Sequence, residues 1–142
     1  MRRADVAAAA RGWVGTPYRH QASMKAVGCD CLGLVRGVWR EVLGAEPELV
    51  PPYSPDWAEA ARRETLLEAA ARNFVPAEGV EAGRLLVFRW RRGMPAKHVG
   101  VAVSATRFVH AYDSAGRAVE GDLAPMWRRR LVATFDFPGV TD

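Results

Sequence analysis

The sequence predicts an α+β fold in which N-terminal helices pack on one side of a C-terminal antiparallel sheet. Apolar residues recur at helical spacing up to residue 74, whereas short apolar runs typical of strands follow Gly79. Only short turns separate these runs, which favours antiparallel pairing. The length of 142 residues suits a single domain, residues 1–142, with one core.

Two helices are expected before residue 45. The first covers about residues 5–14 and ends at Gly15-Thr16-Pro17, where glycine and proline disfavour helix. An irregular segment without helical or strand periodicity follows. The second helix begins after Asp30, a residue type that caps helix N-termini, and carries apolar residues at helical spacing. Gly44 is expected to end it in a left-handed conformation.

A third helix and the strands of the sheet follow. After a proline-rich loop over residues 47–55, Ser54-Pro55 can begin a helix that runs to about Phe74, with room for a break near Arg63. Strands are expected at residues 85–90, 98–103, 107–112 and 131–137, with a weaker one at residues 118–121.

Composition and charge argue against two classes of protein. No run of eighteen apolar residues is present, so the sequence predicts no membrane span. The net charge of +4 favours anionic partners, but the arginines are scattered and no nucleic-acid-binding motif accompanies them, so no nucleic acid is expected. Residues 1–6 lead into an alanine-rich stretch with Arg11, which is typical of an amphipathic helix rather than a signal peptide.

Cys31 is the strongest candidate for a catalytic residue. It is expected in the first turn of the second helix, where unpaired N–H groups and the helix dipole favour its thiolate. Its own N–H would stabilise an oxyanion. His98 begins one predicted strand and His110 lies in the next, so antiparallel pairing can bring the two imidazoles together. This set predicts Cys31 as nucleophile, His98 as general base and acid, and His110 as the residue that fixes the tautomer of His98.

Other interpretations stay open from the residue types alone. A cysteine at a helix start is often a small buried hydrophobe, and either histidine could have a structural role. Cys29 and Cys31 with His98 and His110 also have the right ligand types for zinc, although one intervening residue is fewer than the usual two to four. A disulfide between the two cysteines is disfavoured by its geometry, and Cys29 is expected to pack beside the nucleophile.

Four blocks of the sequence resemble the NlpC family of papain-like cell-wall cysteine peptidases, in the order of that family. They are Gly15-Thr16-Pro17-Tyr18, Asp30-Cys31-Leu32-Gly33-Leu34-Val35, His98-Val99-Gly100-Val101 and Phe108-Val109-His110-Ala111. The resemblance covers nearly the whole chain and is closest to the branch found in phage tails and gene transfer agents. It implies a papain-like core and the same three catalytic roles. It also implies that Tyr18 lies beside the nucleophile; Tyr18 and Asp30 are the expected substrate-binding residues.

The resemblance implies a peptidoglycan endopeptidase that cleaves a stem-peptide amide through a cysteine acyl-enzyme, without a cofactor. Expected partners are peptidoglycan and the hub or baseplate proteins of a phage-like tail. The protein would be made in the cytoplasm, without a signal peptide, and carried in a virion or gene-transfer-agent tail. The alternative is a non-catalytic structural or wall-binding tail component. Leu32, where the family often has serine or threonine, and residues 19–22 depart from the family pattern and bear on substrate specificity.

Overall fold

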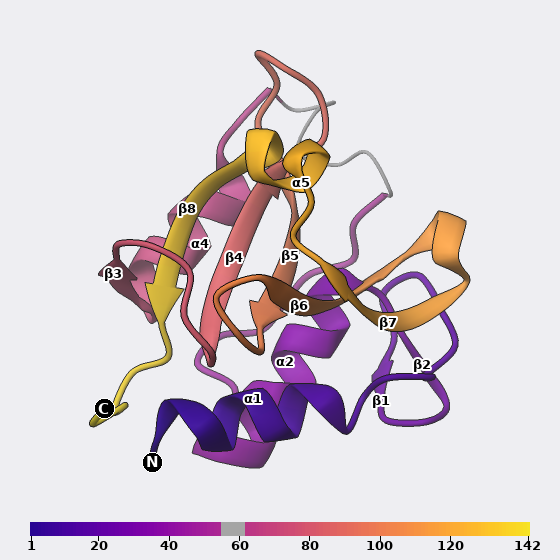
Figure 1. Cartoon of the computed structure of the whole chain (residues 1–142). Helices are drawn as coiled ribbons and strands as arrows, with labels where there is room; N and C mark the ends of the chain where they lie inside the picture. Colours follow the sequence, from indigo (N-terminus) through magenta and orange to yellow (C-terminus); the bar gives the residue numbers. More distant parts are fainter. Residues whose placement is uncertain (55–61) are drawn as a thin grey trace.

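Residues 1–54 and 62–142, the part of the chain that the computed structural model describes, form helices packed on an antiparallel sheet (Figure 1). The six strands have the order β3-β8-β4-β5-β6-β7, and all neighbours pair antiparallel. They are β3 (Val75–Ala77), β4 (Arg84–Arg89), β5 (Ala96–Ala102), β6 (Arg107–Tyr112), β7 (Arg117–Asp122) and β8 (Leu131–Asp136). The prediction of an α+β fold is confirmed.

Helices and a small second sheet surround these strands. The helices of the described residues are α1 (Arg3–Arg11), α2 (Cys31–Leu43), α4 (Thr65–Asn73) and α5 (Pro125–Arg130), with a 3₁₀ turn η1 (Asp113–Ala115). The second sheet pairs β1 (Ser23–Met24) with β2 (Gly28–Cys29) directly before α2. In Figure 1 this hairpin lies beside η1 and β7, on the side of the molecule away from β3.

The two faces of the large sheet carry separate hydrophobic clusters, because strand side chains alternate between faces. On β4, Leu85 and Val87 belong to the cluster that includes α1, α2 and α4. Leu86 and Phe88 belong to the other cluster, which Trp127 of α5 completes. The N-terminal helices therefore share one face, as expected, whereas α5 covers the opposite face. The six residues of α5 are too few for a periodic signal, so the sequence did not predict it.

The first two helices differ from the predictions mainly at their ends. Helix α1 stops at Arg11, before the expected residue 14, although Trp13 beyond it is buried. Helix α2 begins where expected, with the Asp30 side chain accepting a hydrogen bond from the N–H of Gly33. Gly44 ends it with φ of 90° and ψ of −135°. Its φ is positive, as a glycine permits, but the conformation is not the left-handed helical one that was expected.

The third helix is shorter in the described residues than the sequence predicts. Helix α4 spans Thr65–Asn73. Residues 62–64, next to the expected break at Arg63, are not helical, and Arg62 has a φ of 53°. The predicted helical positions 55–61 lie outside the described residues. All five predicted strands are present within two residues of their expected ends. The short strands β1, β2 and β3 were not predicted, because runs of two or three residues give no usable alternation.

Candidate active site

Asp30 holds the start of α2 in place. Its carboxylate accepts hydrogen bonds from the backbone N–H groups of Gly33 and Gln21, each at 2.7 Å, and from the hydroxyl of Tyr53. Asp30 is only 2% exposed, and these bonds all come from the protein itself. Its expected contact with substrate stays a prediction, since what the structure describes is a residue that positions Cys31.

Cys31 is the first residue of α2 and is partly exposed. Burial and the neighbouring Asp30 carboxylate raise the pKa of its thiol to about 12. The backbone N–H groups of Val99 and Leu32 and of Cys31 itself are directed at the sulfur and act against this rise. The helix start therefore supplies the expected N–H groups, but the expectation of a more acidic thiol is wrong, because burial and the adjacent negative charge outweigh them.

The N–H of Val99 places the nucleophile against β5, one residue from His98. The ring atom Nε2 of His98 lies 2.9 Å from Nδ1 of His110 on β6, so the two imidazoles are hydrogen bonded. Gly100 lets β6 approach β5 closely, because a Cβ there would lie 2.9 Å from the ring of Phe108 and 3.1 Å from the Cβ of His110. The structure thus brings together the two histidines that the sequence paired.

Both histidines are buried and uncharged near neutral pH. Burial lowers the pKa of His98 well below its usual value, and the charges of His110, Lys97 and Arg130 lower it further. Burial alone lowers the pKa of His110 to about 4. A neutral imidazole can accept a proton, so His98 is in the protonation state that a general base requires.

Tyr18 lies close to the nucleophile, as the family resemblance implies. It forms an isolated parallel bridge with Cys29, two residues before Cys31. Burial, followed by the negative charges of Cys31 and Asp30, raises the pKa of Tyr18 to about 12, so its hydroxyl stays protonated and can donate a hydrogen bond. Cys29 is fully buried, which agrees with its expected packing role.

His20, the third histidine, lies in the exposed loop before β1. Its Nε2 is 2.6 Å from the backbone carbonyl oxygen of Tyr53. The side chain amide of Gln21 donates to the same oxygen at 2.7 Å. These contacts tie the loop of residues 19–22 to the segment before the undescribed residues, and the structure gives His20 a loop-bonding role.

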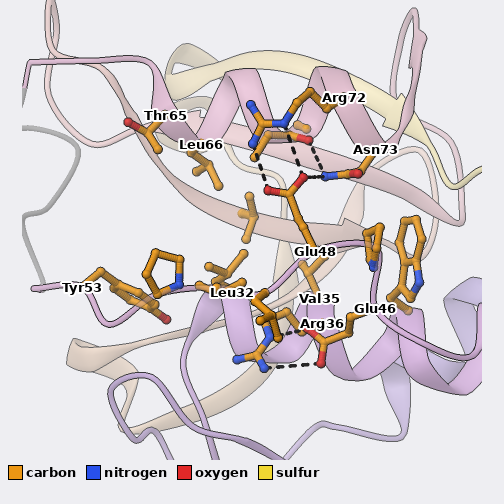
Figure 2. Close-up of a pocket in the computed structure, with 18 of the residues that line it drawn as sticks. Leu32, Val35, Arg36, Glu46, Glu48, Tyr53, Thr65, Leu66, Arg72 and Asn73 are labelled. Atoms are coloured by element: carbon orange, nitrogen blue, oxygen red, sulfur yellow. Dashed lines mark hydrogen bonds and ion pairs between the residues drawn. The ribbon is translucent and has the colours of Figure 1, made fainter.

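A cavity of about 800 Å³ opens between α2, α4 and the loop of residues 46–54 (Figure 2). Leu32, which follows the nucleophile, and Val99, which follows His98, both line it. Figure 2 shows Tyr53 on the same side as Leu32; the ion pair Glu48–Arg72 joins the loop to α4, and the ion pair Glu46–Arg36 joins the loop to α2. Cys31 and His98 are not among the lining residues, so the cavity adjoins the candidate catalytic residues without containing them.

Aromatic side chains that the sequence did not single out surround the two histidines. They are Phe88, Trp90, Phe108, Tyr112 and Trp127. Tyr112 and Phe108 could have been found, since they lie two residues on either side of His110 on one strand face. Trp127 lies in the unpredicted α5, and only the folded chain places it here.

The zinc alternative requires Cys29, Cys31, His98 and His110 to converge. Within residues 1–54 and 62–142, no group of three or more His, Cys, Asp or Glu side chains is placed to hold a metal ion. The four-ligand site therefore does not form in this fold. Within the same residues, no helix has the length and apolar character to cross a bilayer.

Known structures share this arrangement of helices on an antiparallel sheet, which is that of papain-like α+β domains. The NlpC/p60 domain of the peptidoglycan hydrolase SagA aligns with a TM-score of 0.67 and 22% identity, over 96% of this chain and all of that one. An NlpC/P60 family protein from Bacillus cereus gives 0.69 and 16%, over 96% of this chain and 40% of that one. The peptidoglycan hydrolase RipB from Mycobacterium tuberculosis gives 0.54 and 20%, over 96% and 67%.

Sequence comparison assigns the family. The sequence model of the NlpC/P60 family matches residues 15–135, so the chain belongs to the NlpC/P60 family. The murein DD-endopeptidase MepS/murein LD-carboxypeptidase of Escherichia coli K12 is 30% identical over 118 residues. The match covers 83% of this chain and 54% of that protein, so the chain spans about half the length of the curated relatives it matches. The phage-tail setting stays a prediction.

Proposed function

We propose that this chain hydrolyses an amide bond of the peptidoglycan stem peptide through a cysteine acyl-enzyme, with Cys31 as the nucleophile. The observation that carries the proposal is the position of Cys31 against Val99, one residue from His98, whose imidazole bonds to His110. A thiol close to the strand that carries an oriented imidazole suits acyl transfer. Family membership, and the murein substrate in the name of the E. coli relative, support a cell-wall substrate.

In the proposed cycle, His98 accepts the thiol proton of Cys31 as the sulfur attacks the carbonyl carbon of the amide. The N–H of Cys31 and the hydroxyl of Tyr18 stabilise the negative oxygen that forms. Protonated His98 then gives its proton to the leaving nitrogen, the C–N bond breaks and a thioester remains. Water, deprotonated by His98, attacks the thioester; the carboxylate product leaves, and the proton returns to the Cys31 sulfur.

Both reacting groups begin this cycle uncharged. The pKa of Cys31 is raised to about 12 and that of His98 is lowered, so a thiol and a neutral imidazole form the resting pair. Proton transfer therefore accompanies attack on the substrate and is not completed beforehand. This state also protects the partly exposed thiol from oxidation, because the thiolate is the reactive form.

Digestion of purified peptidoglycan, with products identified by mass spectrometry, tests the proposal. The unaltered chain should release fragments with a newly cleaved stem-peptide amide, and Cys31→Ala should release none while keeping its melting temperature. Cys29→Ala removes the only other thiol of the chain and should retain activity. Hydrolysis by Cys31→Ala would contradict the mechanism. Binding of the unaltered chain to peptidoglycan without any cleavage would indicate the non-catalytic alternative.

We propose that the enzyme acts from a phage-like tail, next to hub or baseplate proteins, and opens the wall locally. The support is the similarity of the residues around Cys31 to the phage-tail and gene-transfer-agent branch. Tail particles from the source cells should contain this chain by peptide mass spectrometry, and antibody labelling should place it on the tail. Particles that lack it would contradict this setting.

We propose further that residues 1–142 act as one domain. The larger hydrophobic cluster supports this, because it joins Val6 of α1 to Phe137 near the C-terminus. Limited proteolysis should yield no stable half of the chain.

A further inference from the structure

Helix α5 places one indole against both candidate catalytic histidines. The Trp127 ring stacks on His98, with centroids 5.6 Å apart and planes inclined by 29°. The same ring meets His110 edge to face, at 4.9 Å and 86°. Trp127 is buried, and α5 lies on the sheet face opposite to α2. The indole therefore packs against the imidazole pair from the face of the sheet opposite to α2.

Further rings restrict each imidazole from other directions. His110 is stacked between its strand neighbours Phe108, at 4.1 Å, and Tyr112, at 4.8 Å. His98 has Trp90 at 5.2 Å in a T-shaped contact. A change in the plane of either imidazole would lose these ring contacts. The packing therefore selects the ring orientations that allow the bond between Nε2 of His98 and Nδ1 of His110.

Arg130 holds Trp127 in this position through its guanidinium group. Its guanidinium carbon lies 5.3 Å from the centroid of Trp90 and 5.7 Å from that of Trp127, so one cation contacts both indoles. The groups that act on the charge of His98 come from several elements: His110 on β6, Lys97 on β5 and Arg130 on α5. All three disfavour a proton on His98, which adds to the effect of burial.

We propose that Trp127, held by Arg130, is a positioning residue that keeps His98 bonded through Nε2 to His110 and leaves its Nδ1 to exchange protons with Cys31. This inference rests on the proposed function for its catalytic meaning. If Nδ1 of His98 is the base, Nε2 must carry the ring proton and donate it to Nδ1 of His110. His110 must in turn be protonated on Nε2. The direction of this bond sets the pair of tautomers, and the packing of Trp127 holds the ring orientation in which the bond forms.

Nitrogen NMR of the imidazoles tests this arrangement without substrate. In the unaltered chain, both buried histidines should be neutral Nε2–H tautomers at pH 7. Trp127→Leu should shift the ring nitrogens of His98 towards a tautomer mixture, and Trp127→Phe should largely restore them because it keeps a stacking ring. Arg130→Gln should move the titration of His98 to higher pH, since it removes a nearby positive charge. Arg129→Gln, which removes the same charge from an exposed position of α5, should leave both properties unchanged.

Kinetics on muropeptides give the second measurement. Trp127→Leu should lower kcat by roughly ten- to hundred-fold with little change in KM, because it misplaces the base without touching substrate. The acid limb of its pH–kcat profile should move towards pH 6.5, and Trp127→Phe should recover most of the rate. Lower kcat with unchanged tautomers and an unchanged acid limb would mean a merely structural role and overturn the proposal. Unaltered kcat and nitrogen shifts in both Trp127 variants would also overturn it.

The two proposals can fail separately. If the unaltered chain cleaves no muropeptide, the proposed function fails, while the NMR result still decides whether Trp127 sets the tautomers. If Trp127→Leu does not fold, the tautomers and the titration of His98 are compared in Trp127→Phe and Arg130→Gln instead, with Arg129→Gln as the control.

Discussion

Asp30 both positions the nucleophile and makes it less acidic. Its carboxylate caps α2 through Gly33 and bonds to Gln21 in the preceding loop, which places Cys31 at the helix start. The same negative charge, together with burial, raises the pKa of the Cys31 thiol. The carboxylate that positions Cys31 therefore also keeps its thiol protonated. This is why the resting pair of Cys31 and His98 is uncharged.

The first prediction concerns the bond between the histidines. His110→Phe keeps a ring in the stack between Phe108 and Tyr112 but removes the atom that bonds to His98. The tautomer of His98 is then no longer set, and kcat on muropeptides should fall by about 10²- to 10⁴-fold. His110→Asn, which keeps a polar acceptor, should lose less. Equal and unaltered rates in both variants would refute the role given to His110.

At the scale of single elements, the start of α2 depends on a close approach by the loop before it. The N–H of Asp30 bonds to the carbonyl of Ala22, and a Cβ at Gly33 would lie only 1.8 Å from that oxygen. The space beside Gly33 is thus filled by the chain itself. The candidate nucleophile Cys31 is therefore held by a helix whose first turn has no room for a side chain at position 33.

The second prediction follows from this contact. Gly33→Ala should lower the free energy of unfolding by about 1–3 kcal/mol, because a backbone carbonyl cannot move aside cheaply. It should also reduce activity by displacing Cys31. Urea denaturation measures the first effect. Gly121→Ala on β7 is the matched control, since a Cβ there meets nothing within 4 Å; equal stabilities for the two variants would contradict the account.

Helix α1 is tied to β4 and β8 by a shared carboxylate. Asp136 accepts two hydrogen bonds from Arg3, at 2.9 and 3.1 Å, and one from Arg84 at 3.2 Å. Arg84 is 8% exposed and shares its charge between Asp136 and Glu81, which lies 2.7 Å away. Arg2 and Asp142 form a similar pair at the surface, also at 2.9 Å.

The third prediction compares these two pairs. Asp136→Asn should destabilise the protein by roughly 1–3 kcal/mol, because Arg3 and the buried Arg84 both lose a charged acceptor, although Arg84 keeps Glu81 as an ionic partner. Asp142→Asn should change stability much less, since solvent already screens that pair. Thermal or urea unfolding of both variants at pH 7 checks the difference. A larger loss for Asp142→Asn would contradict it.

At the scale of the whole molecule, the candidate site is assembled through the sheet. Helix α2 brings Cys31 to β5 from one face, while α5 holds His98 and His110 from the other. Cys31 and His98 are separated by more than sixty residues in the sequence, so only the complete fold forms the site. Both histidines are consequently buried and depend on folding for their pKa.

The fourth prediction is a loss of stability in mild acid. In the unfolded chain a histidine titrates near pH 6.5, whereas the pKa of folded His110 is about 4 and that of His98 is also lowered. Between these values the unfolded state binds more protons, so stability rises with pH and is lost as pH falls from 6.5 towards 4. His110 alone contributes on the order of 3 kcal/mol over this range.

Urea midpoints at pH 7, 6 and 5 measure this loss before most carboxylates titrate. The His110→Phe variant should show a weaker pH dependence, because it has one fewer buried imidazole. A midpoint that stays constant between pH 7 and pH 5 would contradict the burial of the two histidines.

Much of the fold was predictable because its signals are local. Asp30 and Gly44 mark the ends of α2, and alternating apolar residues mark β4, β5, β6 and β8. The unpredicted helix α5 has six residues, fewer than two helical turns, and the unpredicted strands β1, β2 and β3 have two or three, so neither periodicity nor alternation can build up over them. The pairing of His98 with His110 was predictable too, because a short turn joins their strands.

The sequence by itself determined the order of elements, the helix start at Cys31 and the family to which the chain belongs, because caps, periodicity and motifs act over a few residues. The tertiary structure alone decided that the thiol is weakly acidic, that Leu32 lines a cavity, and that Trp127 packs against both imidazoles. Those properties depend on burial and on contacts between distant segments, and no local pattern encodes either.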